Sequence, residues 1–291
     1  MARTKAVACL IAAGILAGCS NSQRITIGSK NFTENVILGE IAAQHIENRL
    51  GEKVERRLDL GGTLLAHQAL VNGEIDLYPE YTGTALTAIL KLPPSSDDAA
   101  VQDKVRREYR RRWSIEWLDP LGFNNTFAMV IRGEEARASR IRTLSEAARY
   151  SSGWRLGAGY EFSQRPDGLA GLLRAYDLPL NGAPVSMDLG LLYKALESKQ
   201  VDMAAANSTD GMLSVLDVRV LRDDKNYFPP YQAAIAVRQA ALAAHPRLRA
   251  VLAELSGKFS DQTMQKLNYQ VDGEHRRIPD VASRFLARAF M

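Results

Sequence analysis

One short pattern, a helix end followed by a turn and a buried strand, occurs twice in this sequence and constrains the fold more than any other feature. Leu196–Met203 aligns with Leu70–Leu77 at an offset of 126 residues, and Asp202 stands where Asp76 stands. Repetition of a supersecondary unit indicates two lobes of one architecture, each with a strand that points toward the other lobe. The sequence therefore predicts two similar lobes in one chain of 291 residues.

Strands and helices alternate around the first copy of this pattern. Ile25–Ile27 alternates like a first strand, Val54–Leu60 is a second strand candidate, and a helix that ends at Gly51 separates them. Asn31 and Glu34, three residues apart, have the spacing of a capping box that starts this helix. The order β-α-β-α-β predicts a parallel sheet covered by helices.

The third strand leads directly into a candidate binding site. Ile75–Tyr78 is apolar, Pro79 lacks the N–H that a central strand needs, and Thr82–Thr84 opens a new helix with hydroxyl groups. A strand that ends at a helix N-terminus is a common ligand position in open α/β sheets, which makes Tyr81 a candidate binding residue. The alternative at this stage is that Tyr81 only packs against the core.

The remaining elements predict how the chain divides. The segment after residue 237 is helical and has no strands of its own, so we expect it to pack on the first sheet. This predicts a discontinuous first lobe, 20–125 plus 232–291, and a second lobe, 126–231. The two crossings, near Asn125 and Tyr231, would form a hinge.

The N-terminus predicts export. Residues 1–19 combine a basic start, an apolar stretch and small residues before Cys19, which resembles a bacterial lipoprotein signal with lipidation at Cys19. Cleavage would remove Cys9 and the charges of Arg3 and Lys5, which lowers the formal net charge from +4 and leaves no thiol for a disulfide, a metal or catalysis. We expect a protein held at the membrane only by this lipid, facing the periplasm or the cell surface. The alternative is an uncleaved anchor.

A charged helix predicted over Asp97–Trp113 carries five arginines. They could form a basic patch for a phosphate backbone, but Asp and Glu are plentiful nearby and no aromatic residues are placed for stacking on bases. The pattern favours a solvated outer face, and we expect no nucleic-acid partner.

No arrangement typical of an enzyme is present in the sequence. The four histidines lie outside metal-ligand spacings, and no GxSxG, SxxK or glycine-rich phosphate loop occurs. We therefore expect no enzyme activity, no metal and no cofactor, and a ligand-binding role in a cleft between the lobes fits better.

Several segments resemble, in order, those of the binding proteins of osmoprotectant ABC importers, the OpuAC/ProX-like family. They are Gly28–Glu34, Leu60–Thr63, Gly73–Thr84, Phe123–Thr126, Thr209–Gly211 and Pro229–Tyr231. The resemblance covers nearly all of the chain after Cys19. It implies an α/β, two-lobed periplasmic-binding-protein-like (type II) fold, with two parallel-rich sheets and a ligand cleft at the hinge. It also implies a quaternary amine as ligand.

The resemblance also implies how such a ligand is held. In the family, aromatic rings surround the trimethylammonium, because a cation without N–H groups is best held by ring faces. Positive and hydroxyl donors hold the carboxylate. The matching positions are Lys30, Thr84 and Arg165 for the carboxylate, Tyr81 and Tyr231 for two walls of the aromatic cage, and the backbone carbonyl of Asn125 near the cation.

Two cage positions depart from the family pattern. Phe127 stands where tyrosine is usual, and Asn207 replaces a ring altogether. The loss of one ring face predicts a weak betaine binder, or a carboxylate ligand whose other end is bulkier or more polar than trimethylammonium. The alternative for the intact positions is local: Arg165 would pair with Glu161 or Asp167 on its own loop, and Tyr231 would pack beside two prolines.

Taken together, the sequence predicts a lipid-anchored, monomeric receptor that captures a small zwitterionic quaternary amine and passes it to an ABC permease with its ATPase. A receptor for another amino-acid-like zwitterion, or a sensor with the same cleft, are the alternatives.

Overall fold

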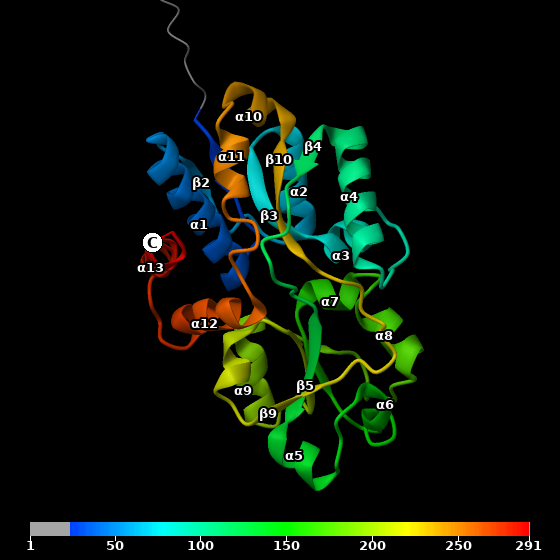
Figure 1. The fold of residues 1–291 in the computed structure, drawn as a ribbon. Helices are drawn as coiled ribbons and strands as arrows, with labels where there is room; N and C mark the ends of the chain where they lie inside the picture. Colours follow the sequence, from blue (N-terminus) through cyan, green and yellow to red (C-terminus); the bar gives the residue numbers. More distant parts are fainter. Residues whose placement is uncertain (1–23, 291) are drawn as a thin grey trace, which may run out of the picture.

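The computed structural model describes residues 24–290, which form two lobes that each contain a five-stranded sheet (Figure 1). The first sheet has the order β2-β1-β3-β10-β4 and the second has the order β7-β6-β8-β5-β9. The strands of the first sheet are β1 (Thr26–Gly28), β2 (Glu55–Arg57), β3 (Leu77–Tyr81), β4 (Ile115–Trp117) and β10 (Ala233–Arg238). Those of the second are β5 (Phe127–Arg132), β6 (Leu156–Ala158), β7 (Val185–Ser186), β8 (Met203–Asn207) and β9 (Val218–Leu221).

Helices cover both sheets. In the first lobe they are α1 (Thr33–Leu50), α2 (Thr63–Asn72), α3 (Thr82–Thr84), which continues as a π-helical turn over Ala85–Ile89, α4 (Asp98–Trp113), α10 (Gln239–Ala244), α11 (Leu248–Ala253), α12 (Asp261–Asp272) and α13 (Ile278–Ala289). In the second they are α5 (Gly133–Ala138), α6 (Leu144–Ala147), α7 (Tyr160–Gln164), α8 (Leu169–Tyr176) and α9 (Leu192–Glu197), with 3-10 turns at Leu189–Leu191 and Gly211–Ser214. As expected, the C-terminal helices add no strand of their own: α11, α12 and α13 pack against α1.

The predicted repeat is confirmed in detail. Strand β3 begins at Leu77 and β8 at Met203, and each is the central strand of its sheet. Asp76 accepts a hydrogen bond from the backbone N–H of Thr26 at 2.9 Å, and Asp202 accepts one from that of Arg155, also at 2.9 Å. The two aspartates therefore hold equivalent neighbouring strands, which explains why both copies of the pattern carry one.

Each sheet is mixed. Two of its four strand pairings are parallel and two are antiparallel, because one strand in each sheet, β10 in the first and β5 in the second, runs antiparallel to both of its neighbours. The chain passes between the lobes twice, and the two passages lie side by side: the backbone N–H of Asn125 donates to the carbonyl of Tyr231 at 3.1 Å. The lobe limits of 20–125 plus 232–291 and 126–231, and a hinge at these passages, stay predictions.

The expectation that Pro79 ends a central strand is wrong. Pro79 lies inside β3 opposite Ile235 of β10. Its carbonyl accepts a hydrogen bond from the Asn35 side chain at 2.9 Å, so it points away from β10. In an antiparallel pair the N and O of one residue point the same way. The nitrogen of Pro79 therefore also faces away from β10, and its missing N–H removes no hydrogen bond between β3 and β10.

The expected capping box of Asn31 and Glu34 is also wrong. Helix α1 begins at Thr33 after Phe32, without a side-chain cap, and Glu34 turns toward the space between the lobes.

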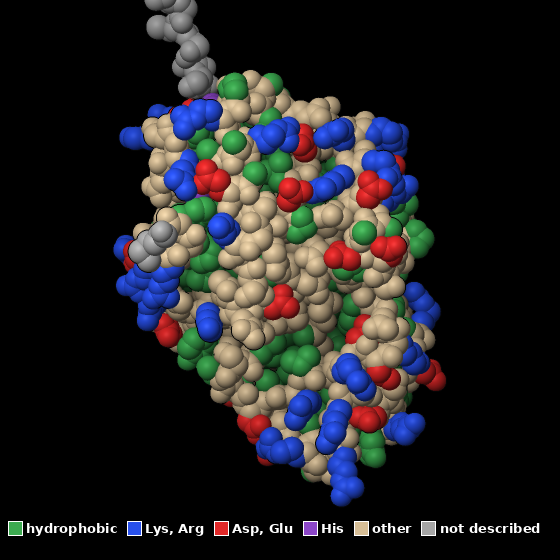
Figure 2. Space-filling view, viewed as in Figure 1, with side chains coloured by type: hydrophobic (Ala, Val, Ile, Leu, Met, Phe, Trp, Pro, Cys, Tyr) green, Lys and Arg blue, Asp and Glu red, His purple; other side chains and the backbone are tan. Residues whose placement is uncertain are grey.

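The expected solvated face of α4 is confirmed. All five of its arginines pair with carboxylates, and positive and negative side chains are interspersed on the surface (Figure 2). None of the helices within residues 24–290 is long and apolar enough to cross a membrane.

Candidate functional site

A cavity of about 1620 Å³ opens between the lobes. All eight binding residues predicted from the sequence line it: Lys30, Tyr81, Thr84, Asn125, Phe127, Arg165, Asn207 and Tyr231. They come from the loop between β1 and α1, from the ends of β3, β5 and β8, from α3, from the loop after α7, and from both passages between the lobes. Cys19, the predicted lipidation residue, lies outside the described residues.

The cationic end of the cavity contains Lys30, which is buried, and Arg165, whose side chain is 10% exposed. Lys30 Nζ lies 2.5 Å from Glu80 Oε1, and the Arg165 guanidinium makes two bonds to Asp167, at 2.5 and 3.0 Å. Arg165 also donates to Thr84 Oγ1 at 3.0 Å. The pairing of Arg165 with Asp167 is thus the local alternative left open by the sequence, but Arg165 reaches Thr84 of the other lobe as well.

Electrostatics at this end favour the charged forms. Burial alone would raise the pKa of Asp167, but the charge and hydrogen bonds of Arg165, together with a bond from Tyr231, hold that pKa below its usual value. Burial lowers the pKa of Arg165, but the charge of Asp167 and its hydrogen bond raise it by more, so the pKa of Arg165 lies above its usual value. Arg165 therefore keeps its charge in the buried site.

Three aromatic rings lie beside these cations. The ring centroids of Phe127 and Tyr231 are 5.7 Å apart, and the guanidinium carbon of Arg165 lies 5.0 Å from the first and 5.6 Å from the second. Lys30 Nζ lies 5.2 Å from the centroid of Tyr81. The cage and the carboxylate grip implied by the resemblance are therefore contiguous, with the protein's own cations against the rings.

The hydroxyl groups of both tyrosines are bonded to carboxylates. Tyr231 donates to Asp167 at 2.5 Å and Tyr81 donates to Glu34 at 2.7 Å. Burial raises the pKa of each phenol well above its usual value, so both stay protonated and can donate to these carboxylates. These bonds fix the rings in the orientation that faces the cavity.

Glu34 is the main site residue that the sequence reasoning missed. Its carboxylate accepts four hydrogen bonds, from Tyr81 and Asn125 at 2.7 Å each, from Thr209 at 2.5 Å and from Asn268 at 3.0 Å. The donors come from both lobes, from one of the passages between them and from α12. Burial nevertheless raises the pKa of Glu34. Its place in the Gly28–Glu34 segment of the family resemblance could have indicated this role, but Glu34 was assigned to a helix capping box instead.

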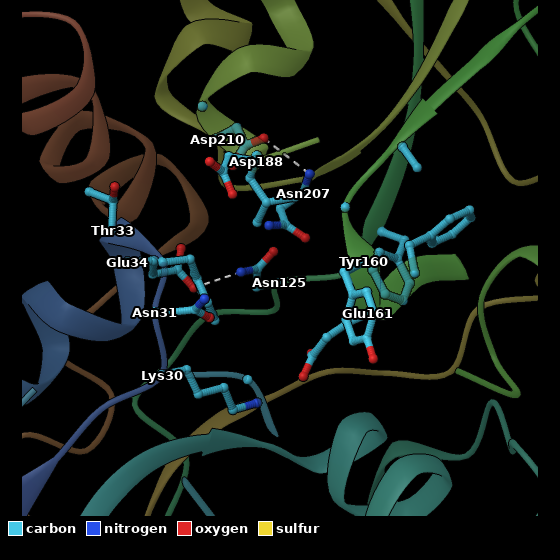
Figure 3. A pocket seen from close by; sticks show the side chains of 18 of the residues that line it. Lys30, Asn31, Thr33, Glu34, Asn125, Tyr160, Glu161, Asp188, Asn207 and Asp210 are labelled. Atoms are coloured by element: carbon cyan, nitrogen blue, oxygen red, sulfur yellow. Dashed lines mark hydrogen bonds between the residues drawn. The ribbon is translucent and has the colours of Figure 1, made fainter. Parts of the chain in front are cut away.

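The two positions that depart from the family pattern are neighbours. Phe127 and Asn207 lie directly opposite each other in the β5–β8 pair. The backbone N–H of Asn207 donates to Asp210 at 3.1 Å, and Tyr193 donates to the same carboxylate oxygen at 2.9 Å. In Figure 3, Asp210 and Asn207 lie at one end of the cavity and Lys30 and Glu161 at the other. Asp210 thus lies at the Asn207 end, whereas the other end combines Lys30 and Arg165 with the carboxylates of Glu80, Asp167 and Glu161.

Asp210 makes stability depend on pH. Burial, with the negative charge of Glu34 as a smaller contribution, raises its pKa from 3.8 to about 7. A carboxyl group with a raised folded-state pKa holds its proton more tightly in the folded protein, so the free energy of unfolding falls as pH rises from about 4 to 7. We expect Asp210→Asn to remove up to about 3 kcal/mol of this fall between pH 5 and pH 8, measured by urea unfolding at these two pH values. An unchanged difference between the two pH values would contradict it.

A second contact between the lobes involves Glu161 of α7. Its carboxylate accepts hydrogen bonds from the backbone N–H of Thr63 and from Thr63 Oγ1, the latter at 2.9 Å. Thr63 is the first residue of α2, so the carboxylate caps this helix. Gly62 leaves room for it, because a Cβ there would lie 2.6 Å from Glu161 Oε1. Burial would raise the pKa of Glu161, but Lys30, Thr63 and Arg165 hold it below its usual value.

Metal ligation has no support in the part of the chain that the structure describes, which contains no group of three or more His, Cys, Asp or Glu side chains placed to hold an ion. The site offers rings, carboxylates, amides and two buried cations. Such groups can bind and orient a small charged molecule.

Comparison with known proteins identifies the family. Residues 23–288 match the OpuAC family model, described as the substrate binding domain of the ABC-type glycine betaine transport system. The chain belongs to this family. As an OpuAC protein it is a substrate-binding component of an ABC transport system and is not an enzyme.

Individual relatives agree with this assignment. The chain is 36% identical over 289 residues to a glycine-betaine-binding protein of Pseudomonas aeruginosa, covering 96% of this chain and 92% of that protein. It is also 36% identical, over 91% of its length, to an ergothioneine transport permease/ergothioneine binding protein of Helicobacter pylori, of which it spans only 47%.

Among solved structures, one named as a glycine betaine/carnitine/choline ABC transporter is 32% identical with a TM-score of 0.77, covering 91% of this chain and 98% of that one. The predicted two-lobed fold is thereby confirmed.

Proposed function

We propose that this OpuAC protein captures a small zwitterionic quaternary amine, such as glycine betaine, in the cavity between its lobes and hands it to a membrane permease with its ATPase. The observation that carries the proposal is the combination of cations and aromatic rings in one cavity. Lys30 and Arg165 lie beside Tyr81, Phe127 and Tyr231, and Glu34 and Asp210 line the same cavity. A zwitterion offers a carboxylate to the cations and an ammonium to the rings and carboxylates.

Each end has a suitable partner in the ligand. The carboxylate would accept hydrogen bonds from Lys30, Arg165 and Thr84, of which the first two supply charge-assisted bonds. The quaternary ammonium would lie against the faces of Tyr81, Phe127 and Tyr231. The backbone carbonyl of Asn125 would lie near the cation, and the carboxylate of Asp210 beside Asn207 would attract it whenever that group is ionised.

Export and a lipid anchor at Cys19 are part of this proposal. Cys19 is five positions before Arg24, where the described chain begins, so the lipid would hold the first lobe close to a membrane. We expect palmitate label to enter the intact protein in cells and to be lost in Cys19→Ser. Equal labelling of both proteins would contradict lipidation at this residue.

Uptake in cells tests the transport role. A strain lacking this gene should lose uptake of labelled betaine at low external concentration, and the wild-type gene should restore it. Unchanged uptake, with binding retained by the purified protein, would favour a sensor in place of a transport component.

The missing ring at Asn207 makes a separate prediction. Asn207→Tyr should tighten betaine binding about two- to thirtyfold, because a cation–π contact contributes about 0.5 to 2 kcal/mol. Asn207→Ser is the matched control, since it changes the same position without adding a ring. Equal betaine affinities for the wild type and Asn207→Tyr, measured by calorimetry, would contradict the account of a reduced cage.

A further inference from the structure

A small pocket on the second lobe is lined mainly by arginines. Its volume is about 170 Å³, and its lining residues are Ala136, Arg137, Arg140, Ile141, Arg142 and Arg219. Within residues 24–290 it shares no lining residue with the cavity between the lobes. Figure 1 places α5, where the pocket begins, at the end of the second lobe that is farthest from the first, and Figure 2 shows Lys and Arg side chains gathered at that end. This arginine pocket is therefore separate from the proposed betaine site.

The backbone around the arginine pocket is fixed. Arg137 lies in the last turn of α5, and Arg219 lies on β9, an edge strand of the second sheet. Arg140 and Arg142 flank Ile141, whose buried side chain anchors the loop after α5. The carbonyl of Arg142 accepts a hydrogen bond, at 3.0 Å, from the first backbone N–H after β9. The loop and the strand therefore hold their arginines around one space.

The guanidinium of Arg137 is held in place by Asp217. Two hydrogen bonds of 2.7 Å join it to the two carboxylate oxygens. Gly133 leaves room for this pair, because a Cβ there would overlap Asp217 Oδ1. A guanidinium has five N–H donors, so the pair leaves three for another acceptor.

The other carboxylates near the arginine pocket are engaged elsewhere. On α5, Glu134 pairs with Lys199 at 3.3 Å and Glu135 pairs with Arg132 at 2.6 Å. Glu146 accepts hydrogen bonds from backbone N–H groups at the start of α6 and closes its capping box. These contacts leave the positive charge of the pocket largely uncompensated.

Three of the four arginines have no ion pair. Within residues 24–290, none of Arg140, Arg142 and Arg219 pairs with a carboxylate, whereas all five arginines of α4 do. Like charges repel each other, so an anion placed between them lowers the free energy of the cluster. A phosphate group has several oxygens that share negative charge, and guanidinium groups bind them through paired, charge-assisted hydrogen bonds.

We propose that the arginine pocket is a binding site for a phosphate group, which Arg140, Arg142 and Arg219 hold together with Arg137. The phosphate belongs either to the head of an anionic phospholipid or to a free phosphate ion. The volume of about 170 Å³ admits such a group with some water, because one water needs only about 10–15 Å³ of this space. The site does not depend on the proposed function, since it uses none of the residues of the cavity between the lobes.

Vesicles and inorganic phosphate are the two probes that test the site. The protein used is residues 20–291, which contain the whole described fold. It should sediment with vesicles of phosphatidylglycerol, or give heat with inorganic phosphate in calorimetry. Arg140→Gln/Arg142→Gln/Arg219→Gln should weaken this binding at least about tenfold, because each arginine contributes separately to attraction by an anionic surface.

A second triple variant is the matched control. Arg174→Gln/Arg284→Gln/Arg288→Gln removes the same charge from exposed positions away from the pocket and should weaken binding less than about twofold. Cooperative unfolding in urea shows that each variant is folded. Inorganic phosphate, added at constant ionic strength, should also release the wild-type protein from vesicles, a readout that needs no variant.

The outcomes separate the two sources of phosphate. Vesicle binding that is lost in the pocket variant and kept in the control assigns the site to a phospholipid head. Heat with inorganic phosphate that is lost in the pocket variant, without vesicle binding, assigns it to a free phosphate ion. Equal weakening in both triple variants would show attraction by overall charge and would overturn the proposal. Binding of neither probe by folded wild-type protein would overturn it as well.

Discussion

Replacing Arg165 and Asp167 together, as Arg165→Gln/Asp167→Asn, should weaken binding of betaine and carnitine at least a hundredfold. Arg165 supplies a fixed positive charge in the cavity, since Asp167 and Thr84 hold its guanidinium. Charge-assisted hydrogen bonds contribute about 1.5–3 kcal/mol each, and two of them account for the expected loss. The measurement is calorimetric titration of wild type and variant with each ligand.

The double variant avoids an artefact of the single one. Arg165→Ala would leave the Asp167 carboxylate buried without a partner, which costs about 3–5 kcal/mol and could unfold the protein. Arg132→Gln is a matched control, because Arg132 is similarly buried, pairs with Glu135 and Asp202, and lies away from the cavity. Betaine affinity in the double variant within tenfold of the wild type would contradict the carboxylate grip.

Removal of Glu34 should have the largest effect on stability. Glu34→Ala leaves four buried donors, from Tyr81, Asn125, Thr209 and Asn268, without their acceptor. Each unsatisfied buried group costs about 1–3 kcal/mol, and after relaxation we expect a loss of about 3–5 kcal/mol in the free energy of unfolding. Betaine affinity should also fall more than tenfold, because the Tyr81 ring loses the bond that orients it. Urea unfolding and calorimetry measure the two effects.

Two further variants make this prediction specific. Glu34→Gln keeps one oxygen as an acceptor but points N–H groups at two donors, so its loss of stability should be intermediate. Glu47→Ala lies on the same helix, where its carboxylate meets Arg56 at a partly exposed position, and should cost no more than about 1 kcal/mol with no change in affinity. Equal effects of Glu34→Ala and Glu47→Ala would show that Glu34 does not organise the site.

The sequence predicted those parts of the fold that depend on local patterns and on repetition. The offset that aligns Asp76 with Asp202 identified the central strands of both sheets, and each aspartate makes the equivalent bond to a neighbouring strand. Pro79 was misjudged because the direction of its N and O in the sheet depends on which strand lies on each side.

The binding residues were predicted through the family resemblance, and the structure brings all eight to one cavity. What the sequence did not indicate is how they are held. The partners of Glu34 lie 47, 91, 175 and 234 positions away along the chain, so no local spacing reveals them. Glu161 and Thr63 are 98 positions apart and meet only because the lobes face each other. Side chains that hold a site together through tertiary contacts therefore look like ordinary helix residues in the sequence.

The most direct test of the central claim is calorimetric titration of residues 20–291 with glycine betaine, choline and carnitine in turn. We expect micromolar or tighter binding of betaine, and weaker binding of choline, which lacks the carboxylate that Lys30, Thr84 and Arg165 would hold. No heat from any of the three ligands, with a protein that unfolds cooperatively, would contradict capture of a simple quaternary amine in this cavity.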